Sequence, residues 1–172
     1  MFQRKQTLWL IIAAISMAVC MFLPMASYRL ALPDGTQLEA TFGIDHNSTP
    51  DLQEAVGKAF GKCPVPVWPL VVCSLGTLLL SIFALTLYKK RVLQMRVVAG
   101  ALALCFVYIA LVFIWGVDSY GEWIAQCTGA LRPRPEWEGG SYLSLVALVF
   151  LIMAYYAIRG DEAKVRAADR LR

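Results

Sequence analysis

The chain has five cysteines, and two of them, Cys63 and Cys127, lie outside its long apolar runs. The other three, Cys20, Cys73 and Cys105, lie within the runs and are expected to be small core residues. One cysteine in each polar segment, facing an oxidising compartment, predicts a structural disulfide between Cys63 and Cys127. Free thiols and a redox-active pair are the alternatives. Neither cysteine belongs to a Cys-x-x-Cys motif, which disfavours redox catalysis.

Other arrangements for catalysis or metal binding are weak. His46 is the only histidine, and no second ligand lies at a helical or loop spacing from it. Glu122, Glu136 and Glu138 have no nucleophile or histidine nearby, so solvated carboxylates are the expected state. We therefore predict no cofactor and no metal, and we favour a protein that is not an enzyme.

Four long apolar runs are the elements that must position these residues. A helix of about 20 residues, rising about 1.5 Å per residue, crosses the ~30 Å hydrocarbon core of a bilayer. No ionisable residue lies in the central part of a run, which argues against a pump or an ion-coupled transporter. The sequence predicts an all-α membrane protein of one domain, residues 1–172, with four transmembrane helices in an up-down bundle. These helices are expected at residues 7–28, 67–88, 92–117 and 141–160.

The segments outside the helices are two outer loops, 29–66 and 118–140, and a cytoplasmic tail, 161–172. In the first loop, two β-compatible segments flank Pro33-Asp34-Gly35, and this turn sequence predicts a small hairpin. A hydroxyl cap, a proline and an early acid at residues 48–51 indicate a helix start. Apolar residues at helical spacing follow over 52–60, so we expect an amphipathic helix on the outer surface.

The distribution of basic residues predicts the orientation in the membrane, because Lys and Arg accumulate in cytoplasmic loops. With the N-terminus in the cytoplasm, eleven basic residues lie inside and five outside, whereas only three of the twelve acidic residues lie inside. We therefore predict a bacterial inner-membrane protein with both termini in the cytoplasm. The net charge of +4 gives no indication of a nucleic-acid partner, because the basic residues are distributed as the positive-inside rule predicts for a membrane protein.

The inner side carries the residues that we expect to contact lipid or a protein partner. These are Lys89, Lys90, Arg91, Arg166, Arg170 and Arg172. The tail alternates in charge, with Glu162 and Arg166 one helical turn apart. Two interpretations follow for the tail: a solvated helix end with basic anchors to anionic lipid, or a docking surface for another membrane subunit.

Three stretches carry a pattern that resembles a known family. The start, MFQRKQTLWLIIAAISMAVCMFLPMAS, has a Gln-Arg-x-Gln opening, an apolar helix and a Leu-Pro exit. The inner turn YKKRVLQMRV and the tail RGDEAKVRAADRLR complete it. Together they resemble the family known as domain of unknown function 4293, small four-helix inner-membrane proteins of Bacteroidota. The resemblance implies this topology and no assigned activity, and it does not extend to the outer loops that hold Cys63 and Cys127.

Two functions from different classes remain. The first is a non-enzymatic accessory or assembly subunit of a membrane complex, favoured because the helices lack intramembrane charge and the inner surface is patterned. The alternative is a membrane thiol–disulfide oxidoreductase that uses the outer-loop cysteines. Bound quinone with a cycling cysteine pair would favour the second.

Overall fold

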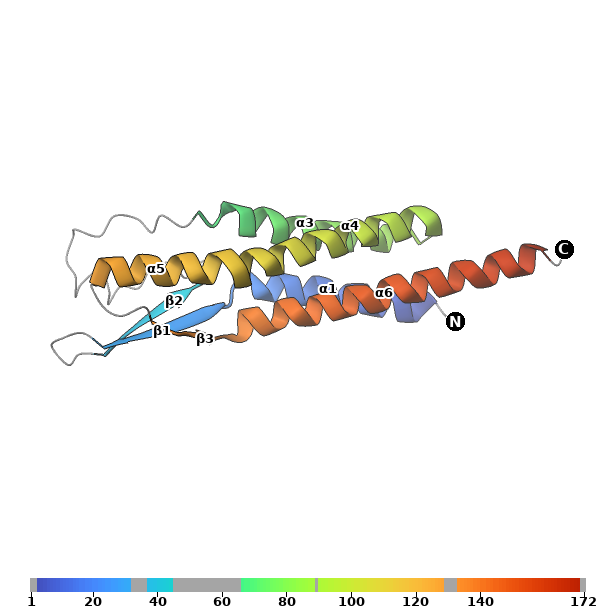
Figure 1. The fold of residues 1–172 in the computed structure, drawn as a ribbon. Coiled ribbons are helices and arrows are strands. Elements are labelled where there is room, and N and C mark those ends of the chain that lie inside the picture. The colour runs from blue at the N-terminus through green and yellow to red at the C-terminus, as the bar shows by residue number, and fades with distance from the viewer. Residues whose placement is uncertain (1–2, 32–36, 45–65, 89, 129–132, 171–172) are drawn as a thin grey trace.

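The described part of the chain forms four helical columns that run alongside one another (Figure 1). The structure is a computed structural model that describes every residue except 1–2, 32–36, 45–65, 89, 129–132 and 171–172. The columns are α1 (Gln3–Cys20), α3 (Trp68–Thr86), α6 (Gly139–Arg170), and a rod that joins α4 (Arg91–Ala110), the π-helix η1 (Leu111–Gly116) and α5 (Val117–Thr128).

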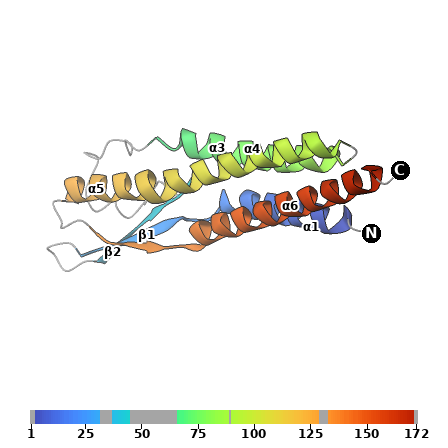
Figure 2. The same cartoon turned by 45° about the vertical axis from the view of Figure 1, so that its right-hand side comes forward.

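Each column contacts two others, which closes the bundle. Helix α1 contacts α6 and α3, and α4 contacts α3 and α6. Both chain termini and the turn between α3 and α4 lie at one end, which we call the terminal end (Figures 1 and 2). The strands and α5 lie at the other end, which we call the sheet end. The chain therefore runs up and down through neighbouring columns.

Three of the described helices are long and apolar enough to cross a membrane. They are Trp68–Thr86, Arg91–Gln126 and Gly139–Val165. The apolar part of α1, Gln6–Cys20, is shorter. Its about 15 residues extend ~22 Å, which is less than the hydrocarbon core of a bilayer.

Helix α3 buries three of its hydroxyl groups against an otherwise apolar core and exposes large apolar side chains. Ser74, Thr77 and Ser81 of α3 are buried. Each donates its hydroxyl hydrogen to a carbonyl three or four residues earlier in the helix, at 2.7–3.0 Å. On the opposite face of α3, Leu79 is 63% exposed and Val72 is 58% exposed. Small hydroxyl residues at helix contacts, with large apolar residues outside, are typical of helices that pack in lipid.

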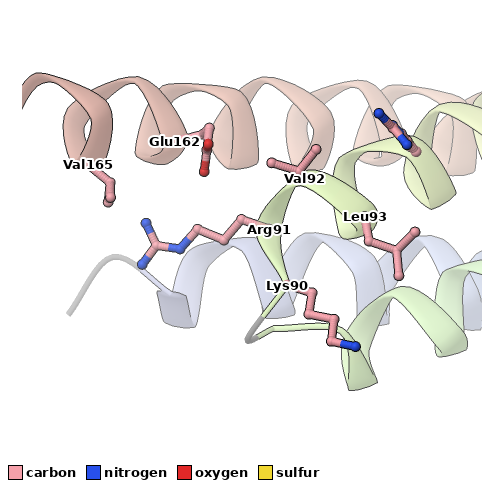
Figure 3. Close-up of a pocket in the computed structure, with 7 residues that line it drawn as sticks. Lys90, Arg91, Val92, Leu93, Glu162 and Val165 are labelled. Carbon is pink, nitrogen blue, oxygen red and sulfur yellow. The ribbon is translucent and has the colours of Figure 1, made fainter. Parts of the chain in front are cut away.

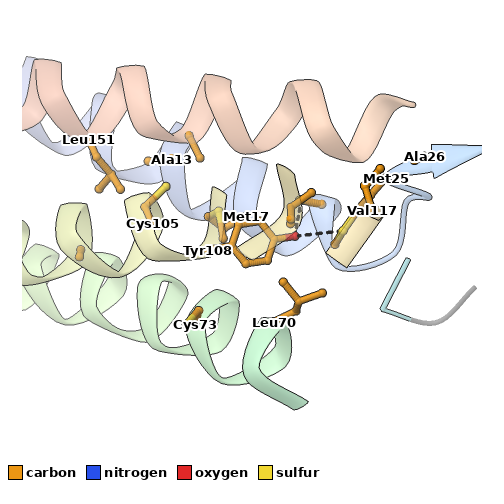
Figure 4. Close-up of a cluster of buried hydrophobic side chains, with 14 of the residues drawn as sticks. Ala13, Met17, Met25, Ala26, Leu70, Cys73, Cys105, Tyr108, Val117 and Leu151 are labelled. Atoms are coloured by element: carbon orange, nitrogen blue, oxygen red, sulfur yellow. Dashed lines mark hydrogen bonds between the residues drawn. The ribbon is translucent and has the colours of Figure 1, made fainter. Parts of the chain in front are cut away.

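Near the C-terminal end of α1, contacts between sulfur and hydroxyl groups join three helices inside the bundle. Tyr108 of α4 is fully buried, and its hydroxyl lies 3.9 Å from the Sδ of Met25 (Figure 4). The same hydroxyl lies 3.3 Å from the Sγ of Cys20, which also donates to the carbonyl of Gly140 at 3.1 Å. These contacts connect α1, α4 and α6 without an ionised group.

The first helix is shorter than predicted. The expected helix over 7–28 is wrong beyond Cys20, where α1 ends. Pro24 has no N–H to continue a helix. The backbone N–H and C=O of Met25 instead bond to β2 and to the segment before α6. The apolar residues that follow form strand β1 (Ala26–Ala31), and apolar run length alone could not separate this strand from the helix.

A three-stranded antiparallel sheet covers the sheet end. Strand β1 pairs with β2 (Gln37–Phe42) and with β3 (Pro135–Trp137), in the order β2-β1-β3. The hairpin of β1 and β2 confirms the hairpin predicted around Pro33-Asp34-Gly35. The third strand was not predicted, because it comes from the distant second loop. The amphipathic helix expected at 52–60 lies outside the described residues.

The third helix extends well past its predicted end at residue 117. Through η1 and α5 it continues to Thr128, so the first half of the predicted loop 118–140 is helical. Helix α5 buries Val117, Tyr120 and Ile124 at helical spacing while exposing charged residues on its other side. The apolar run therefore ends at residue 117 although the helix does not.

Aromatic residues join the sheet to the rod. The hydroxyl of Tyr28 in β1 donates to the carbonyl of Val117 at 2.6 Å. The ring of Tyr120 lies 5.5 Å from the ring of Tyr28 and 5.2 Å from that of Phe42, measured between centroids. A Cβ on Gly116 would lie 2.9 Å from the Cζ of Phe42. The absence of a side chain at Gly116 thus allows β2 to approach η1.

The fourth helix agrees with its predicted range and continues beyond it. The expected span over 141–160 lies inside α6, which extends to Arg170. The tail after residue 160 is therefore a continuation of the same helix, in which the buried side of the bundle ends at Ile158.

Candidate functional site

The turn between α3 and α4 forms the base of the candidate site at the terminal end. Lys90 precedes the first turn of α4 with a non-helical backbone, φ −111° and ψ 71°. Its N–H donates to the carbonyl of Leu87 at 2.9 Å, and its carbonyl accepts from the N–H of Gln94 at 2.9 Å. The buried side chain of Gln94 donates to the carbonyl of Ala84 at 3.0 Å. These bonds hold the start of α4 against the end of α3.

A hollow of ≈ 600 Å³ lies between the first turns of α4 and the C-terminal part of α6 (Figure 3). We call it the terminal groove, and its lining residues are Lys90, Arg91, Val92, Leu93, Arg96, Glu162 and Val165. Figure 3 shows the side chain of Arg91 extending from the start of α4 between Glu162 and Val165 of α6. The volume falls within the ~300–1,000 Å³ range of small-molecule sites in proteins.

The terminal groove has an excess of positive charge. Its lining includes three cationic residues, Lys90, Arg91 and Arg96, and one carboxylate, that of Glu162. Lys90 and Arg96 are exposed, whereas Arg91 is half-buried and donates from Nη1 to the carbonyl of Asp161 at 3.5 Å. The N–H groups in the first turn of α4 add the positive end of a helix dipole at the same place.

Helix α1 holds α6 in place beside the groove. The side-chain amide of Gln6 donates to the Oδ2 of Asp161 and, at 3.3 Å, to the carbonyl of Ala157. Gln6 is 8% exposed, so these bonds lie at the edge of the packed bundle. The position of Glu162 and Val165 therefore depends on contacts made by a helix that does not itself line the groove.

The structure brings together two of the six predicted contact residues, Lys90 and Arg91. Lys89 and Arg172 lie outside the described residues. Arg166 and Arg170 lie in α6, and their side chains are not described. The prediction of a common contact surface for all six thus remains a prediction.

Sequence reasoning named Glu162 only as part of the charged tail and did not connect the other lining residues with the turn. Val92 and Arg96 are four residues apart in α4, and Glu162 and Val165 are three apart in α6, so each pair shares a helix face. This spacing was a usable signal within each helix. The juxtaposition of the two faces depends on tertiary packing and has no local signal.

The cysteines divide as expected within the described residues. Cys20, Cys73 and Cys105 are buried free thiols of the bundle. Cys127 lies near the end of α5, and its side chain is not described. Cys63 lies outside the described residues. The disulfide between Cys63 and Cys127 therefore stays a prediction.

The acidic residues near the sheet end have structural partners. The carboxylate of Glu136 lies 3.2 Å from the guanidinium of Arg29, and that of Glu138 accepts from the hydroxyl of Ser27 at 2.9 Å. Both contacts join β1 to the segment around β3. Within the described ranges, no cluster of three or more His, Cys, Asp or Glu side chains could hold a metal ion. His46 lies outside these ranges.

Comparison with known proteins gives one match. A family model described as "Domain of unknown function (DUF4293)" matches residues 2–171, nearly the whole chain. No curated protein and no solved structure matches.

Proposed function

We propose that this chain, which belongs to the DUF4293 family, is an integral membrane protein that serves as an accessory or assembly subunit of a membrane complex. In this proposal all four columns cross the inner membrane, with both termini and the terminal groove in the cytoplasm. The extension of α6 beyond the bundle is the docking element for a protein partner.

The membrane placement is supported by the distribution of exposed apolar and aromatic residues. Trp68 begins α3 and Tyr88 follows its end by two residues; they are 66% and 52% exposed and 20 positions apart, which corresponds to about 30 Å along a helix. This distance equals the thickness of the hydrocarbon core, and exposed Trp and Tyr residues accumulate at its two interfaces. The basic residues of the terminal end favour the cytoplasm for that end.

The observation that carries the accessory role is the unbroken course of α6. The helix has 32 residues, or about 48 Å, which is more than a bilayer core requires. Its C-terminal part extends past the other columns in both views (Figures 1 and 2). After Ile158 it carries acidic and basic residues in alternation. A rigid charged helix fixed to a bundle presents its side chains in a defined geometry to a partner.

Truncation after Gly160 tests this role. We expect the truncated protein to remain in the membrane fraction, because the buried part of α6 ends at Ile158. A partner that co-purifies stoichiometrically with the full chain in mild detergent should be lost. Asp161→Asn in the full chain is the control, since it weakens the contact with Gln6 and keeps the extension.

The two results separate the role of the extension from that of the bundle. Loss of the partner on truncation, with retention in Asp161→Asn, supports docking through the extension. Equal recovery with the truncated protein contradicts it. Absence of any stoichiometric partner of the full chain contradicts the accessory role.

A further inference from the structure

We propose that the terminal groove is a binding site for one anionic phospholipid, whose headgroup lies against the cationic part of the lining, formed by Lys90, Arg91 and Arg96. The proposal rests on the membrane placement given above and is independent of any protein partner.

The first argument is that the groove is amphiphilic. Its three cations come from the turn and first two turns of α4, and its apolar lining comes from Val92 and Leu93 of the same segment and Val165 of α6. Val92 and Leu93 are each about two-fifths exposed. A phosphate next to an acyl chain matches this combination, because cations bind the phosphate while apolar side chains cover the start of the chain.

The second argument is the level of the groove along the bundle. Tyr88, two residues after the end of α3, and Tyr156 of α6 are exposed near the terminal end, at 52% and 62%. Exposed tyrosines mark the headgroup level of a bilayer. Lys90 and Arg91 lie in the turn just after Tyr88, and Glu162 and Val165 follow Tyr156 by six and nine positions. Because α4 then runs back alongside α3, Arg96 returns towards the level of Tyr88, so the groove lies at and just beyond this level. A lipid in the adjacent leaflet can therefore place its headgroup there without leaving the membrane.

The third argument is charge selectivity. The lining has three positive groups and one negative group, so a ligand with net negative charge is favoured over a zwitterionic one. The first-turn N–H groups of α4 add donors that suit a phosphate oxygen. The carboxylate of Glu162 opposes binding of the phosphate, which gives a prediction of opposite sign for its removal.

Native mass spectrometry of the purified full chain tests the proposal. The protein is released from detergent micelles that contain palmitoyl-oleoyl phosphatidylglycerol, phosphatidylethanolamine or phosphatidylcholine at equal concentration. We expect one phosphatidylglycerol to be retained per chain at concentrations where the other two lipids are not. Addition of millimolar inorganic phosphate should displace little of it, because phosphate has no acyl chain for the apolar lining.

Three single variants make the test specific to the groove. Arg96→Gln should weaken retention of phosphatidylglycerol about fivefold, the effect of losing one cation at an anionic lipid. Glu162→Gln should strengthen it by a similar factor. Arg159→Gln is the matched control, because Arg159 is exposed on α6 but does not line the groove, and it should leave retention unchanged.

The outcomes decide between a lipid site, a phosphate site and a diffuse charged surface. Equal retention of phosphatidylethanolamine and phosphatidylglycerol would overturn the anionic preference. Full displacement by inorganic phosphate would reassign the groove to free phosphate. An Arg159→Gln effect as large as that of Arg96→Gln, or no gain from Glu162→Gln, would overturn the discrete site. Glu162 and Val165 belong to the extension of α6 that truncation after Gly160 removes, so the lipid test uses point substitutions in the full chain. Loss of the lipid preference in these variants is therefore read separately from loss of a partner on truncation.

Discussion

Among the glycines that the structure describes, Gly140 has the least space for a side chain. Its N–H donates to the carbonyl of Pro24 at 2.9 Å. A Cβ at this position would lie 2.7 Å from that carbonyl oxygen and 2.9 Å from the carbonyl oxygen of Leu23. Both neighbours are backbone atoms and cannot move as the end of a flexible side chain could. Gly160 in the same helix has nothing within 4 Å of such a Cβ.

We predict that Gly140→Ala destabilises the protein by about 1–3 kcal/mol, because α6 must separate from the chain that leaves α1. Gly160→Ala should be neutral or stabilise by up to about 1 kcal/mol through helix propensity. Thermal unfolding of both variants in the same detergent measures the difference. Equal stability of the two variants would show that the close approach at Gly140 does not constrain the bundle.

We also predict that Cys63 and Cys127 form a structural disulfide. The bond would close a loop of about 65 residues and contribute roughly 2–4 kcal/mol to stability by the chain-entropy estimate. Alkylation before lysis, followed by non-reducing mass mapping, should recover the two peptides linked. The buried thiols of Cys73 and Cys105 are the internal control and should remain unlinked.

The same mapping distinguishes the oxidoreductase alternative. A linked pair that does not change when quinone or a thiol reductant protein is added supports a structural bond. A pair that cycles between linked and alkylated states would favour thiol–disulfide exchange. Complete alkylation of both residues would show that Cys63 and Cys127 are free thiols and would contradict the predicted disulfide.

At the scale of elements, apolar run length located the helices and failed at their ends. It placed α3 within two residues, because prolines precede that run and basic residues follow it. It overextended α1, since β1 continues the apolar composition after Pro24. It gave a third helix that was too short, because α5 is amphipathic and its exposed charged residues end the apolar run at residue 117. Period-3.6 spacing of Val117, Tyr120 and Ile124 was the available signal for that helix.

The terminal groove was predictable only in part, because its two sides come from helices that are distant in the sequence. The basic turn at Lys90 and Arg91 was recognisable because three basic residues interrupt two apolar runs. The groove itself requires α6 to lie opposite α4, a relation fixed by packing through Gln6 and the bundle core. Likewise, β3 joins β1 across more than one hundred residues of sequence, and its three residues carry no strand pattern of their own.

The contact between the hairpin and the rod gives a prediction at this scale. Gly116→Ala should separate β2 from η1, because the added Cβ would lie 2.9 Å from the Cζ of Phe42. The variant should therefore be cleaved faster by protease in the hairpin, while the bundle stays resistant. Gly100→Ala is the matched control in the same rod, since its Cβ would lie 3.7 Å from the Cδ1 of Leu80, an ordinary contact. Equal cleavage of both variants would contradict the docking role of Gly116.

At the scale of the whole molecule, the rod from α4 to α5 sets the relation between the two ends. Its three parts comprise 20, 6 and 12 residues and extend roughly 55 Å. A bilayer core accounts for only ~30 Å of this length. With the terminal groove at one membrane face, the sheet end must stand outside the other face. The Tyr28–Val117 bond and the aromatic contacts of Tyr120 join the sheet end to the rod, so in the proposed placement the outer part is held to the bundle.

In the proposed topology the bundle crosses the membrane with the terminal end inside and the sheet end outside. The most direct test places alkaline phosphatase, which is active only outside the cytoplasm, at one end or the other. Fusion after Arg172 should be inactive, while green fluorescent protein at the same position should fluoresce and report equal expression. Insertion of the phosphatase at residues 129–132, between α5 and β3, should be active. Activity of the fusion after Arg172 together with an inactive insertion would contradict the account.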